Sequence, residues 1–185
     1  MTKDEERECY MFGTQLAMHC IYSSDNNKSF YELFKSLSKI DQNKILKEFA
    51  LYRSSLVAGK LLSEINDKET LNMILDYFLS KLSDELKIND INVVHQRIGE
   101  YLKIKNVDNT TPHLILQNSG IDISKLDNMV YLYFCSDFFL LNLADNSLGI
   151  GDMFKLFKKR SRKNSGCLGS VLSLIFVICF LVYMI

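Results

Sequence analysis

The chain has 185 residues, of which 48% are hydrophobic and 24% charged, with a single proline. This length and composition fit one folded domain with its own core and exclude a disordered polar tract. The net charge of zero hides an asymmetry, because six of the 22 basic residues follow residue 154 whereas all 22 acidic residues precede it. The part before this point therefore carries about six net negative charges. That balance argues against a nucleic-acid partner, because phosphate contacts require a basic face.

The start of the chain predicts a helix rather than a targeting signal. Thr2 and Glu5 have the spacing of a capping box, and Phe12, Leu16 and Cys20 recur on one face of a helix over residues 3–22. The first ten residues are charged where a secretory signal needs an apolar core, so we predict no such signal. N-myristoylation is excluded because Thr2 stands where glycine is required.

Four further helices follow, each with a recognisable start. Ser29 begins a capping pattern for a short second helix, and Asp41 is the expected cap of a long third helix that ends near Ile65. The "NDKE" turn at 66–69 precedes an amphipathic fourth helix, and the pair Asn89-Asp90 caps a fifth.

The remaining body predicts a short helix and then the most buried one. Thr111 reads as a cap with Pro112 at the first helical position, and Gly120 ends that helix. The stretch at 129–143 has almost no polar face and is therefore expected to be the central helix. These elements predict an all-α fold, a single bundle of six to seven helices. An α+β body is the alternative, because Val130–Cys135 also suits a strand.

The end of the chain predicts a membrane anchor. Gly166 to Ile185 is a run of twenty uncharged residues, which as a helix would rise about 30 Å, the thickness of the hydrocarbon core of a bilayer. A basic run precedes it, and basic residues stay on the cytoplasmic side. We thus expect a cytoplasmic domain at 1–152, a basic stalk at 153–165 and a transmembrane anchor at 166–185. The basic residues, which would contact membrane lipids, are Lys155, Lys158, Lys159, Arg160, Arg162 and Lys163.

The cysteines indicate a reducing compartment. Three lie in the body with no Cys-x-x-Cys pair, which fits neither a disulfide framework nor a zinc site. Cys167, at the expected membrane edge, is a candidate for palmitoylation in a eukaryotic host.

No pattern for metal, cofactor or nucleophilic chemistry is present. None of the three histidines has an acidic residue three positions before it, and the phosphate-loop and Gly-x-Ser-x-Gly patterns are missing. We therefore predict no catalytic residue, no metal and no cofactor, and an enzyme is not the favoured class.

One acidic residue stands out in the apolar stretch. Asp137 is the only charge between residues 129 and 143, and burying it requires a partner. Arg97 and Tyr101, four apart on one helix, are candidate partners, as is Arg53. This polar cluster is expected either to fix how two helices meet or to mark a functional pocket.

The layout resembles that of the tail-anchored apoptosis regulators of the Bcl-2 family, which also have a helical body, a basic stalk and a C-terminal membrane helix. That family's Asn-Trp-Gly-Arg motif is absent, and "LLSEIND" at 61–67 is only a loose match to its Leu-x-x-x-Gly-Asp helix. The ending "KKRSRKNSGCLGSVLSLI" also looks like those of small membrane proteins of low-GC bacteria. The bacterial inner membrane is thus the first expected location, and a eukaryotic or viral tail-anchored protein the second.

Three functions follow as hypotheses. The first is a tail-anchored protein whose acidic cytoplasmic domain binds a protein or a small ligand at the membrane surface. The second is a membrane-held enzyme or sensor with a pocket near Asp137. The third is a Bcl-2-like apoptosis regulator of viral or eukaryotic origin.

Overall fold

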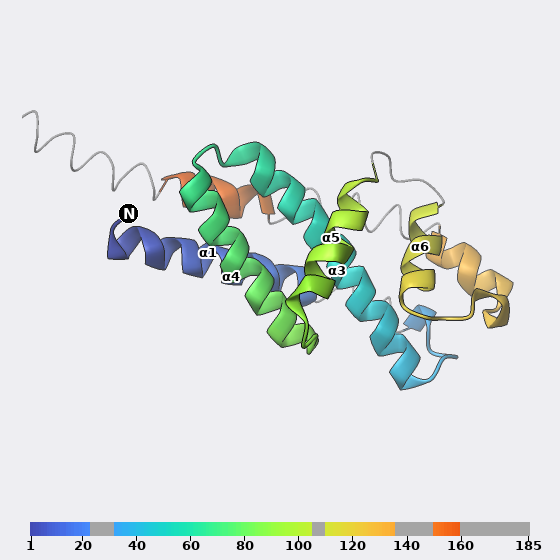
Figure 1. The fold of residues 1–185 in the computed structure, drawn as a ribbon. Coiled ribbons are helices and arrows are strands. Elements are labelled where there is room, and N and C mark those ends of the chain that lie inside the picture. Colours follow the sequence, from blue (N-terminus) through green and yellow to red (C-terminus); the bar gives the residue numbers. More distant parts are fainter. Residues whose placement is uncertain (23–31, 105–109, 136–149, 160–185) are drawn as a thin grey trace, which may run out of the picture.

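A computed structural model describes residues 1–22, 32–104, 110–135 and 150–159, and every regular element within these ranges is helical (Figure 1). The predicted all-α bundle is therefore confirmed for this part of the chain. The alternative strand is wrong, because residues 128–135 form a helix. The elements are α1 (Lys3–Tyr22), α3 (Lys39–Glu64), α4 (Lys68–Leu86), α5 (Ile91–Leu102), α6 (Thr110–Asn118), the 3-10 helix η1 (Ile123–Lys125) and helical stretches at 128–135 and 150–159.

The central helix of the bundle is α3. It contacts α1, α4, α5 and α6, with α6 near one end of the molecule and α1 and α4 toward the other (Figure 1). Residues 48–55 of α3 are all buried. Two serines fit there because Ser54 donates to the carbonyl of Ala50 at 2.7 Å and Ser55 to that of Tyr52 at 2.6 Å. Their hydroxyl groups are thus satisfied within the helix itself.

The stretch expected to be central is more exposed where it is described. Met129, Leu132 and Tyr133 are each more than half exposed, whereas Phe134 is fully buried against Phe34. Only one face of this helix therefore contributes to the core. The rest of the predicted helix, from residue 136, lies outside the described residues.

Most predicted helix starts are confirmed by their hydrogen bonds. The amide of Thr2 donates to Glu5 at 2.7 Å and the amide of Glu5 donates to the Thr2 hydroxyl at 3.3 Å, which is the predicted capping box. Asp67 caps α4 and Asp90 caps α5, each accepting from a backbone amide of the first turn.

Two predicted helix starts, those of α3 and α6, are wrong in detail. The N-cap of α3 is Ser38, not Asp41. The carboxylate of Asp41, in the first turn of the helix, accepts a hydrogen bond of 2.8 Å from the Ser38 hydroxyl. The predicted start of the second helix, Ser29, lies outside the described residues, and the part that is described is helical at 32–33 and continues as turns to residue 36. Helix α6 already includes Thr110, so Pro112 lies within its first turn rather than at its first position.

The helix at 150–159 packs on α1. The ring of Phe12 lies 4.4 Å from that of Phe157, stacked, and 5.2 Å from that of Phe154, edge to face. Lys158 forms an ion pair with Glu64 at the end of α3. The first residues of the predicted basic stalk are therefore held against the helical body.

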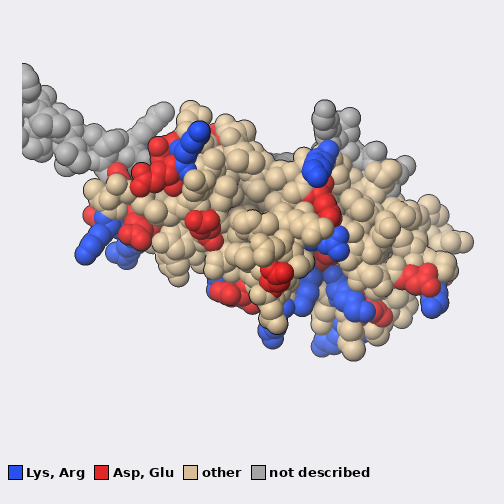
Figure 2. Space-filling view, viewed as in Figure 1, with Lys and Arg blue, Asp and Glu red and all other residues tan. Residues whose placement is uncertain are grey.

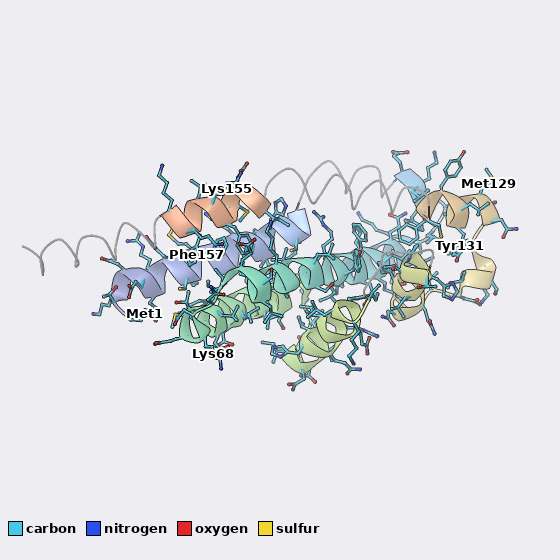
Figure 3. The ribbon with its side chains drawn as sticks, turned by 90° about the horizontal axis from the view of Figure 1, so that it is seen from above. Met1, Lys68, Met129, Tyr131, Lys155 and Phe157 are labelled. Carbon is cyan, nitrogen blue, oxygen red and sulfur yellow. The ribbon has the colours of Figure 1, made fainter. Side chains whose placement is uncertain are left out.

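This helix runs antiparallel to α1. Phe157 lines a pocket together with Met1 and Glu5, whereas Met153 lines a second pocket that extends to Gln15, further along α1. Phe157 accordingly lies over the N-terminal half of α1, on the side of Met1 (Figure 3). The described chain thus stops at the N-terminal end of α1.

Within the described ranges, no helix is long and apolar enough to cross a membrane. The predicted anchor, 166–185, lies outside them, so this finding does not bear on it.

Candidate functional site

A buried polar cluster joins α3, α5 and α6. The hydroxyl of Tyr101 donates to Oε1 of Glu48 at 2.8 Å, and Nδ2 of Asn118 donates to the same hydroxyl at 3.2 Å. Nε of Arg97 lies 3.5 Å from Oε1 of Glu48. Three helices are therefore linked through two adjoining side chains, Glu48 and Tyr101.

Burial dominates the electrostatics of this cluster. It raises the pKa of Glu48 despite the opposing hydrogen bond from Tyr101 and the charge of Arg97. It also raises the pKa of Tyr101, and the charge of Glu48 adds to that shift. Tyr101 therefore stays protonated and acts as a donor to Glu48 near neutral pH.

Three of the four residues of the predicted polar cluster lie in the described part of the chain. Arg97 and Tyr101 do meet a buried acid, but in the described residues that acid is Glu48. The guanidinium of Arg53 lies 5.9 Å from the centre of the Phe49 ring. Asp137 lies outside the described residues. Arg97 and Tyr101 therefore link α5 to α3, and Tyr101 also links it to α6.

Replacing Glu48 by glutamine is expected to change how stability depends on pH. A carboxyl with a raised pKa stabilises the fold below the usual glutamate pKa, and this contribution is lost as pH rises through the raised value. Glutamine keeps an acceptor for Tyr101 without a charge. We therefore expect wild type to lose stability relative to Glu48→Gln as the pH rises above the usual glutamate pKa of about 4.3, measured by urea unfolding at several pH values.

The control for this experiment is Glu100→Gln. Gln96 and Arg97 lower the pKa of Glu100, so its contribution is present above the usual glutamate pKa and is lost on acidification. The two variants should therefore deviate from wild type in opposite directions with pH. Parallel stability curves for Glu48→Gln and wild type would contradict the assignment.

An open pocket lies where α1, α3 and α4 come together, and we call it the α3 pocket. Its volume is about 600 Å³, within the range of ligand-binding sites. The C-terminal ends of α1 and α4 and the N-terminal half of α3 form its walls. Its apolar lining residues include Ile21, Leu46, Phe49 and Leu86.

The charged residues of the α3 pocket are mostly basic. Among the described residues that line it, Lys44, Lys47, Arg53 and Lys87 are basic and Glu85 is acidic. Figure 2 shows Lys and Arg side chains gathered at the lower middle of the molecule, where the end of α4 approaches the first half of α3 (Figure 1). This sign is opposite to the net charge of the body, so the pocket favours negatively charged ligands.

The predicted basic stalk is described only at its start. Lys155 pairs with Asp152 at 3.0 Å, Lys158 pairs with Glu64, and Lys159 is on the same helix. The other predicted residues of the stalk and the lipidation candidate lie outside the described residues, namely Arg160, Arg162, Lys163 and Cys167.

Sequence reasoning missed both Glu48 and the α3 pocket. The partner of Glu48 is 53 positions away in the chain, and an acidic residue on a long helix usually faces solvent. The pocket combines the ends of separate helices. Its one local signal was the spacing of Lys44, Lys47 and Arg53, which follow one another at three and six residues on α3.

Among the described residues, no three His, Cys, Asp or Glu side chains come together to hold a metal ion. No family model matches the chain, and no curated protein or solved structure is significantly similar to it. Functional proposals for this all-helical protein therefore rest on its own residues.

Proposed function

We propose that the chain is a single-pass, tail-anchored membrane protein whose acidic helical body binds a protein or small ligand on the cytoplasmic side. The anchor is Gly166–Ile185, and the basic residues before it hold the body at the cytoplasmic surface. The bacterial inner membrane is the first location, and a eukaryotic or viral membrane the second.

The observation that carries the binding function is the position of the α3 pocket. Cys20 and Ile21, at the C-terminal end of α1, line the pocket, whereas the helix at 150–159 ends near the N-terminal end of α1. These ends are about 30 Å apart along the 20-residue helix. We propose that α1 stands upright on the membrane, so that a body anchored beyond residue 159 presents its pocket away from the bilayer, toward cytoplasmic ligands.

Tethering to the membrane favours this binding function. A protein confined to a membrane surface meets other membrane-bound partners at a raised effective concentration. Arg97 and Tyr101 are already engaged with Glu48 and Asn118, which supports the binding function over an enzyme centred on that cluster.

Membrane fractionation tests the anchor. We expect full-length chain to stay with membranes after alkaline carbonate extraction, and a chain lacking residues 164–185 to be soluble. Phe176→Arg with Phe180→Arg keeps the length and should also release the protein, because each arginine costs about 2.5–3.5 kcal/mol at the centre of a membrane helix.

The matched control is Phe176→Leu with Phe180→Leu, which should remain in the membrane fraction. Wild-type protein in the soluble fraction would disprove the anchor. Protease protection in sealed vesicles tests orientation, since protease added on the cytoplasmic side should digest the body.

A further inference from the structure

We propose that the α3 pocket binds an acidic amphipathic helix of a cytoplasmic partner protein. The direction in which the pocket faces rests on the proposed membrane anchor. The shape and chemistry of the pocket do not depend on that anchor.

The residues of α3 that line the pocket form a row along this helix. They extend from Ile40 to Arg53, a rise of about 20 Å. Asn43, Lys47 and Ala50 fall between these ends at spacings of three and four residues, so they share one face of α3. A site of this length fits about four turns of a peptide helix, which would place apolar side chains against it at spacings of three and four residues.

The lining chemistry matches a helix with one apolar and one acidic face. Phe49, Leu46 and Leu86 offer apolar contacts. Among the described residues, Lys47 and Lys87 have no ion-pair partner of their own. These two ammonium groups, carried by α3 and by the end of α4, are therefore free to pair with carboxylates of a bound helix.

Lys87 is also unusual in its backbone. It ends α4 in the left-handed conformation, with φ of 53°, where glycine or asparagine is the usual choice. A lysine there reduces stability but places a positive charge at the pocket. This is the pattern expected where a residue serves binding rather than folding.

The pocket lies at the end of α1 opposite to the last described residues before the proposed anchor, about 30 Å along that helix. With α1 upright on the membrane, as proposed above, the pocket is beyond the reach of the lipid headgroups. The potential of an anionic membrane surface falls off within a Debye length, about 8 Å at physiological salt. The geometry therefore favours a protein segment.

Peptide binding to full-length protein in nanodiscs of zwitterionic phospholipid tests this proposal. The probe is a fluorescent 14-residue helical peptide with leucines on one face and glutamates flanking them, and the measurement is fluorescence anisotropy. We expect saturable binding, and at least about tenfold weaker binding of a peptide with lysine in place of each glutamate. Lys47→Glu with Lys87→Glu should reverse this preference.

The matched control is Lys68→Glu with Lys125→Glu, which reverses two lysines outside the pocket and should leave binding unchanged. Lys87→Gly separates binding from folding. It should raise Tm by about 2–4 °C, because glycine suits the left-handed position, while weakening binding of the acidic peptide severalfold.

Equal binding of both peptides, or no effect of the Lys47 and Lys87 changes, would overturn the proposal. So would binding of dodecanoate but not of the peptide, which would assign the pocket to a small amphiphile. Fractionation keeps this test separate from that of the anchor. Selective peptide binding by a chain found in the soluble fraction would support the proposed pocket ligand and reject the anchor. A chain in the membrane fraction that does not bind the peptide would support the anchor and reject the proposed pocket ligand.

Discussion

Gly13→Ala is expected to lower the free energy of unfolding by about 2 kcal/mol, and Gly13→Leu by 3 kcal/mol or more. A Cβ atom at Gly13 would lie 2.7 Å from the carbonyl oxygen of Ile74 and 3.1 Å from the backbone nitrogen of Phe78. Both are backbone atoms of α4, so α1 and α4 would have to separate along their extensive interface. This loss exceeds the gain of about 1 kcal/mol from replacing a helical glycine.

Gly99→Ala is the matched control for this prediction. Gly99 is also inside a helix, α5, but nothing lies within 4 Å of an added Cβ atom. It should therefore stabilise the protein by about 0.5–1 kcal/mol. Thermal unfolding of both variants in mild detergent, monitored by circular dichroism, measures the difference in stability. Stabilisation by Gly13→Ala would show that α1 and α4 do not approach each other so closely.

Replacing Phe154 and Phe157 together by alanine is expected to detach the helix at 150–159 from α1. Both rings are buried, at 3% and 8% exposure, and each contacts Phe12. Removing a buried phenylalanine costs about 3 kcal/mol or more. We expect this double variant to be cleaved by trypsin after Lys155, Lys158 and Lys159 much faster than wild type.

Leu156→Ala is the control for this experiment. Leu156 lies on the same helix but is 55% exposed, so its removal should cost less than about 1 kcal/mol and leave the trypsin sites protected. If the double variant and wild type were cleaved at the same rate, the helix at 150–159 would not be held by these two rings.

Local features of the fold were predictable from the sequence. The helix starts at Thr2, Asp67 and Asp90 each depend on a side chain and a backbone amide within three residues of each other. Such spacing can be recognised in the sequence. The start of α3 was misassigned because Ser38 and Asp41 are both capping residue types, and their mutual hydrogen bond allows either choice until the backbone is known.

The central helix and the candidate sites were not predictable in the same way. The middle of α3 contains Glu48, Arg53 and two serines, so it looks less apolar than residues 129–143, yet it is buried. Burial there depends on Tyr101 and Asn118, which other helices supply. Periodicity identifies which face of a helix is apolar, but it does not identify which helix is surrounded on all sides.

The central position of α3 has a consequence for hydrogen exchange. One pair of helices, α1 and α4, and another, α5 and α6, both contact α3. Leu51 and Tyr52, in the middle of α3, are 2% and 1% exposed, and Tyr52 packs edge to face on Tyr101 of α5. We expect the amide protons there to be among the slowest to exchange, so that their exchange rates report the global stability of the bundle.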